Sequence, residues 1–185
     1  MSPSTWRVSG PGTSTRRPAG DGAPGPARLS VSEPQPDIDA YAEMLADGIE
    51  AALPTWVVGS VHRVMTAWAG GVAPEVAEAA EIAGQRARSE TGPAVRALLS
   101  SDIDDQRTTP LTLVRQAVKY PTEVLRRAGV PPVERDRFSA EKFPDDDYDL
   151  SPSSFADVDP ALAEAGIAWG AAKAFLHRRR HGSTG

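Results

Sequence analysis

Apolar residues recur every three or four positions from about residue 37 onward, which is the period of an α-helix. Asp37 is typical of a helix N-cap, and an apolar stripe follows it as far as Leu53. We expect Pro54 to end that helix and to begin a second one. The second stripe consists of Val57, Val61, Val64, Met65 and Trp68. This pattern predicts that Trp68 is in the core and that the helix ends at Gly70.

Two further helical patterns are punctuated by proline and glycine. Pro74 opens the first of them, and Gly92-Pro93 interrupts it, so we expect a kink or two abutting helices there. Thr109-Pro110 opens the next pattern as a cap followed by a first-turn proline. We expect a kink at Pro121 and an end before Gly129.

The last helical pattern begins at Asp159-Pro160 and ends in three arginines, Arg178, Arg179 and Arg180. One of its faces is large and apolar, and the other contains Gly166 and Gly170. Each interior glycine costs about 1 kcal/mol relative to alanine, so we expect the two to mark a close backbone approach. No long alternating strand pattern is present. The chain is therefore predicted to be all-α, a small bundle of four to six helices.

The first 35 residues differ from the rest in composition. They are rich in serine, proline, glycine and arginine, and Trp6 is their only aromatic residue. Such a segment buries too little apolar surface to offset its ordering entropy. We therefore predict a disordered tail over residues 1–35, with Trp6 exposed, and a helical domain over residues 36–181.

Aromatic and acidic residues alternate in a proline-containing stretch before the last helix, over residues 137–159. Disordered segments are poor in aromatic residues, and long irregular loops in compact domains are often functional. We predict a long ordered acidic loop whose aspartates face solvent. Four aromatic side chains are expected to hold it on the helices: Phe138, Phe143, Tyr148 and Phe155.

The acidic run of this loop resembles two metal-binding motifs, and neither match is complete. Asp145, Asp146 and Asp149 match the spacing of a magnesium–diphosphate motif, but prolines flank the run. With Asp147 it also resembles a calcium loop, but Leu150 replaces the required glycine. We therefore predict no metal site and no cofactor. A solvated acidic face is the commoner outcome, and a surface that binds a partner is the functional alternative.

A second polar cluster comprises Asp102, Asp104, Asp105 and Arg107, between two predicted helices. It is a possible polar site at the end of the bundle. Helix capping by these aspartates is the alternative, since such caps are frequent at helix junctions.

Charge and composition narrow the classes of function. The chain has 185 residues, no cysteine and a net charge of −5. Its first 35 residues sum to +2 and its last nine to +3, so the stretch between them sums to −10. An acidic body is not the footprint of a dedicated DNA-binding domain, so a nucleic-acid role through the basic ends is not favoured. We find no targeting segment, no membrane span and no arrangement of nucleophile and base. A cytoplasmic location is expected.

Four short motifs resemble those of conserved small helical proteins of high-GC bacteria. They are Asp104–Arg107, Tyr120–Glu123, Phe143–Asp146 and Trp169–Lys173. No activity is assigned to those proteins, so the resemblance implies no catalytic or binding residue.

Three functions remain open from the sequence. The first is a non-enzymatic interaction or regulatory protein that uses Asp145, Asp146, Asp147 and Asp149 with Arg178, Arg179 and Arg180 to bind a protein partner. The second is a small-ligand binder or enzyme that uses the cluster at residues 102–107, with the loop at 137–159 as a lid. The third is a nucleic-acid accessory factor that uses its basic ends.

Overall fold

The structure is a computed structural model that describes residues 37–101 and 108–181. The described residues contain no strand. Their helices are α1 (Ile38–Ala69), α2 (Pro74–Leu99), α3 (Pro110–Gln116), α4 (Lys119–Arg127), α5 (Arg137–Lys142), the 3-10 helix η2 (Phe155–Asp157) and α6 (Leu162–His181). The predicted all-α fold is confirmed. The predictions for residues 1–35, including Trp6, lie outside the described residues.

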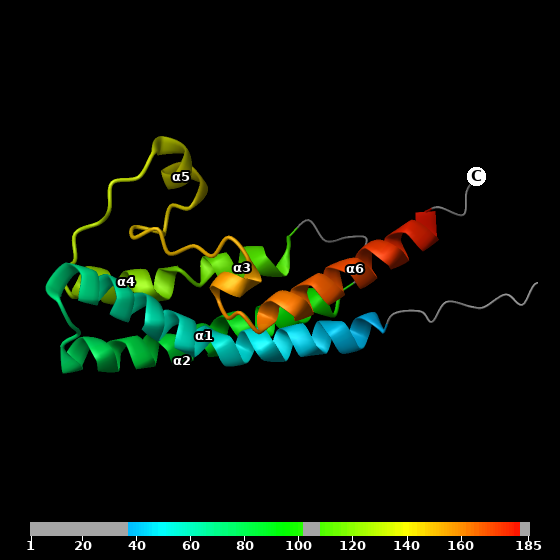
Figure 1. Cartoon of the computed structure of the whole chain (residues 1–185), viewed down its shortest axis with the longest axis horizontal. Coiled ribbons are helices and arrows are strands. Elements are labelled where there is room, and N and C mark those ends of the chain that lie inside the picture. Colours follow the sequence, from blue (N-terminus) through cyan, green and yellow to red (C-terminus); the bar gives the residue numbers. More distant parts are fainter. Residues whose placement is uncertain (1–36, 102–107, 182–185) are drawn as a thin grey trace, which may run out of the picture. The chain divides into compact units, whose positions relative to one another are not determined.

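The helices α1 and α2 form a long hairpin against which α3, α4 and α6 pack (Figure 1). Helix α4 contacts both arms of the hairpin, α3 contacts α2, and α6 contacts α1. The core between them is aliphatic, and its fully buried side chains include Leu45, Ile49, Leu53, Val57, Val61, Val95, Val114 and Leu125.

The predicted helix break at Pro54 is wrong, because α1 continues through it as one helix of 32 residues. A proline inside a helix removes one hydrogen bond and crowds the preceding turn, so it bends the helix. Figure 1 shows that α1 changes direction about halfway along. At this point α2 presents Gly84, and a Cβ atom there would lie 2.9 Å from the Cα and carbonyl oxygen of Pro54. The missing side chain lets the two backbones approach each other.

The prediction that Trp68 is buried is also wrong, since half of this residue is exposed. The last turn of α1, residues 66–69, is exposed throughout, so the apolar stripe continues past the end of the core. Two other tryptophans, Trp56 and Trp169, occupy the core instead.

Two more predicted interruptions of helices differ from the structure. Helix α2 is continuous through Gly92-Pro93, so the alternative of two abutting helices is wrong. The break in the next predicted helix falls between Gln116 and Lys119, and Pro121 lies in the first turn of α4. A first-turn proline loses no intrahelical hydrogen bond, so no kink is required there. The predicted cap is confirmed, because the Thr109 side chain accepts a hydrogen bond from the amide of Thr112.

The two glycines of α6 behave differently. A Cβ atom on Gly166 would lie 2.5 Å from the ring of Phe155, so the close neighbour of this glycine is a side chain and not the backbone that was predicted. A Cβ atom on Gly170 would meet nothing within 4 Å, so the prediction is wrong for this residue.

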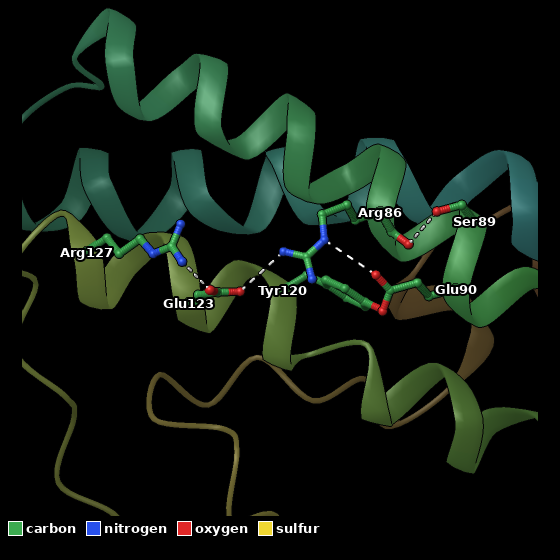
Figure 2. A network of polar contacts seen from close by, with 6 residues as sticks. All are labelled: Arg86, Ser89, Glu90, Tyr120, Glu123 and Arg127. Carbon is green, nitrogen blue, oxygen red and sulfur yellow. Dashed lines mark hydrogen bonds and ion pairs between the residues drawn. The ribbon is translucent and has the colours of Figure 1, made fainter.

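A polar network joins α2 to α4 along one side of the hairpin (Figure 2). The hydroxyl of Tyr120 donates a hydrogen bond of 2.7 Å to Glu90. The guanidinium of Arg86 lies between Glu90 and Glu123 and forms ion pairs with both. Glu123 also pairs with Arg127. The network therefore fixes α4 against α2.

The pKa values of two groups in this network are shifted. Tyr120 is only 2% exposed, and burial together with its bond to Glu90 raises the pKa of its hydroxyl from the usual value of about 10 to about 12. The same hydrogen bond, followed by the charge of Arg86, lowers the pKa of Glu90.

Replacement of Gly84 by alanine tests the close approach of the two hairpin arms. The new Cβ atom would overlap the backbone of Pro54, so Gly84→Ala is expected to lower the free energy of unfolding by about 1–3 kcal/mol. Gly59→Ala is the matched control, because Gly59 is an exposed position of α1 with open space around it. The control is expected to raise stability by up to about 1 kcal/mol. Equal effects of the two changes in urea unfolding would contradict the proposed packing.

The raised pKa of Tyr120 predicts a loss of stability in alkali. The protonated phenol is favoured by the folded state, so its contribution is complete below the unfolded pKa of about 10 and is lost as pH rises through about 12. Tyr120→Phe cannot ionise and is expected to lose less stability than the wild type between about pH 9 and about pH 11.5. Urea unfolding of both proteins at these pH values measures the difference. Equal losses of stability in the two proteins would show that ionisation of Tyr120 does not cause the loss in alkali.

Candidate functional site

The chain between α4 and α6 forms an ordered loop held by hydrogen bonds. It leaves α4, forms α5 and returns toward α3 (Figure 1). The hydroxyl of Tyr148 donates to the carbonyl of Val130 at 2.9 Å, and the amide of Val133 donates to the carbonyl of Asp147 at 2.9 Å. The carboxylate of Asp147 pairs with Arg126 of α4. These contacts attach Asp147 and Tyr148 to Arg126 of α4 and to the chain that follows α4, at Val130 and Val133.

The side chain of Asp146 is buried inside the loop, where its carboxylate accepts hydrogen bonds from the backbone. Asp146 is 1% exposed, and its two oxygens accept the backbone amides of Leu150 and Ser151, each at 2.7 Å. The prediction that this aspartate faces solvent is wrong. Buried amides at a tight turn need an acceptor, and the carboxylate supplies two.

The other aspartates of the run do not converge with it. Asp147 is half-buried in its ion pair with Arg126, and Asp145 and Asp149 are exposed. Asp149 has a φ of 56°, the left-handed conformation that Asp tolerates better than most residues. Each carboxylate therefore has its own surroundings.

Three of the four predicted aromatic anchors are placed as expected. Tyr148 is buried, and Phe143 and Phe155 are half-buried. The prediction is wrong for Phe138, which is 71% exposed. Phe138 lies on the short helix α5, where the ammonium of Lys142, one turn later, lies 5.7 Å from its ring centre.

A groove of about 520 Å³ lies between α3 and the returning loop. Thr112, Arg115 and Gln116 of α3 line one side, with Val118 following them. The loop supplies the other side through Lys142, Phe143, Pro144, Asp145 and Ser151. We call this cavity the α3–loop groove. Its size is within the range of small-molecule binding sites.

Two cations flank an aromatic ring in this groove. The guanidinium carbon of Arg115 lies 5.8 Å from the ring centre of Phe143, and the ammonium of Lys142 lies 5.2 Å from it. Within residues 37–101 and 108–181, neither cation forms an ion pair with a carboxylate. No direct ion pair therefore neutralises these two cations within the described residues, and together with Asp145 the lining carries one net positive charge, which favours an anion.

Hydrogen bonds hold both the guanidinium of Arg115 and the backbone of Phe143. Arg115 donates through Nε to the carbonyl of Pro152 at 2.8 Å and through Nη2 to that of Ser153 at 3.0 Å. The carbonyl of Phe143 accepts from Arg135 at 2.8 Å and from the amide of Asp146 at 3.1 Å. A wall that is already ordered loses little entropy when a ligand binds.

One further polar atom of the wall lacks a partner. Ser151 lines the groove, and its hydroxyl oxygen is buried with no hydrogen-bond partner in the described part of the chain. Buried hydroxyl groups are usually bonded, so rotation toward a ligand would satisfy this one.

The other predicted site residues that the structure describes do not line this groove. Asp102, Asp104, Asp105 and Arg107 lie outside the described residues. Arg178, Arg179 and Arg180 are exposed in the last turn of α6, where positive charge also complements the helix dipole. No described helix is both long and apolar enough to cross a membrane.

Of the residues that line the groove, the sequence pointed to Asp145 as a site residue and to Phe143 only as an anchor of the loop. It did not point to Lys142 or Arg115. The segment from Arg137 to Phe143 interleaves basic and aromatic residues, which was a usable signal for Lys142 and Phe143. Arg115 carried no such signal, because only the fold brings α3 beside the loop.

Comparison of the chain with protein-family models, with curated proteins and with solved structures finds no match in any of the three. We therefore infer the function from the geometry of the groove.

Replacement of Asp146 tests how the loop wall is held. Asp146→Ala removes the acceptor of the Leu150 and Ser151 amides, so both are expected to exchange their hydrogens at least about ten-fold faster. Asp149→Asn is the matched control, since Asp149 is exposed and Asn tolerates the same backbone conformation. Unchanged exchange in Asp146→Ala, measured by NMR, would show that the carboxylate does not hold the turn.

Proposed function

We propose that the protein binds a small organic anion with an apolar portion in the α3–loop groove. The pair of cations beside Phe143, without a carboxylate partner among the described residues, is the observation that supports this function. The anionic group would lie against Arg115 and Lys142. The apolar portion would contact Phe143, Pro144 and Val118.

The ionic contacts supply orientation, and the apolar wall supplies most of the affinity. Charge-assisted hydrogen bonds are about twice as strong as neutral ones, and an arginine already held by Pro152 and Ser153 presents its remaining N–H groups in a fixed direction. Apolar contact area contributes about 25 cal/mol per Å² removed from water. Together these contacts are typical of ligand sites with few polar groups.

The interaction function expected from the sequence stays a prediction. Asp146 and Asp147 are engaged inside the molecule, which leaves Asp145 and Asp149 of the run for a partner. The nucleic-acid alternative through the basic ends also stays a prediction. Arg178, Arg179 and Arg180 are exposed at the end of α6, and the arginines of residues 1–35 lie outside the described residues.

Calorimetry with 3-phenylpropionate and with its neutral amide tests the proposal. The carboxylate is expected to bind at least about five-fold tighter than the amide, because only it carries a charge for the two cations. Lys142→Gln is expected to remove most of that difference. This variant is preferred because Lys142 is exposed and makes no hydrogen bond within the described residues, so its loss leaves the wall intact.

Arg178→Gln is the control, since Arg178 is an exposed arginine at the end of α6 and does not line the groove. Its affinity for the carboxylate should equal that of the wild type. Equal binding of the acid and its amide by the wild type, or absence of binding by either at millimolar concentration, would refute the proposed function.

A further inference from the structure

The groove also contains a negative charge that a simple anion would not use. Asp145 lines the loop side of the α3–loop groove, two residues after Phe143, and its side chain is exposed. In the described part of the chain it forms no ion pair with Arg115 or with Lys142. Opposite charges therefore face one groove without neutralising each other directly.

This separation of charge favours a ligand that carries both signs. A plain carboxylate or phosphate is attracted by the two cations and repelled by Asp145. A ligand with a cationic group beside its anionic group gains an attraction where the simple anion meets repulsion. Its positive group also donates hydrogen bonds that the carboxylate of Asp145 accepts.

We infer that the ligand of the α3–loop groove is an α-amino acid with an apolar side chain, an inference that rests on the proposed function. Its carboxylate binds Arg115 and Lys142, and its ammonium binds Asp145. Its side chain contacts Phe143 and Pro144, the apolar part of the wall.

The groove contains groups that match the remaining polar atoms of such a ligand. An amino-acid carboxylate has two oxygens, and the Ser151 hydroxyl can donate to one of them after rotation, because this buried oxygen has no partner in the described residues. Thr112 also lines the groove, and its hydroxyl already bonds to that of Thr109 at 2.9 Å. The charges and donors of the wall thus fit both ends of a zwitterion.

The test compares L-phenylalanine with 3-phenylpropionate, which differ only in the ammonium group. Phenylalanine is expected to bind about three- to ten-fold tighter by calorimetry, since the added ion pair is partly exposed to water. N-acetyl-L-phenylalanine, which lacks the positive charge, is expected to lose this advantage. Asp145→Asn should likewise reduce the ratio between phenylalanine and phenylpropionate to about one.

Asp149→Asn is the matched control, because it removes another exposed acid of the same loop that does not line this groove. The control should keep the wild-type ratio. If phenylpropionate binds as tightly as phenylalanine, the zwitterion is wrong while the anion site stands. If neither probe binds, the proposed function fails with it. A ratio that persists in Asp145→Asn would overturn the role of Asp145.

Discussion

The buried carboxylate of Asp146 determines where the walls of the groove lie. Burying an ionised group is costly unless it is hydrogen-bonded, and here two backbone amides bond to its two oxygens. These bonds close the turn at residues 146–151, and the amide of Asp146 also donates to Phe143. Phe143 precedes this turn and Ser151 ends it, and both line the groove. One side chain therefore positions both parts of the loop that face α3.

The position of this turn depends on the packing of the helices. The hairpin of α1 and α2 is held closely at Pro54 and Gly84, and the network around Tyr120 fixes α4 on α2. The loop begins where α4 ends, and the pair of Arg126 with Asp147 attaches it there. Arg115 completes the connection, because it bonds to the loop carbonyls that follow the turn. The groove thus lies between α3 and a loop that is attached to α4 through Asp147 and to α3 through Arg115.

Local patterns predicted the helices well but not their interruptions. Caps such as Thr109 and stops such as Gly129, which has a φ of 78°, act within one turn of chain and can be recognised from sequence. Pro54 could not be judged in this way, because its place inside α1 depends on a glycine of another helix. Asp146 resembles its acidic neighbours in sequence, and only the fold of the loop makes it the buried one. The groove was missed for the same reason, since Arg115 is distant in sequence from Phe143.

Chemical-shift mapping by NMR tests the central claim, that the α3–loop groove is the binding site, most directly. Amide and arginine side-chain signals of the full chain would be followed while L-phenylalanine is added to saturation. The account predicts that the largest shifts occur in residues 112–118 and 142–151, with the Nε–H signal of Arg115 among them. Shifts concentrated at the end of α6 or around Tyr120, with the groove unaffected, would contradict it.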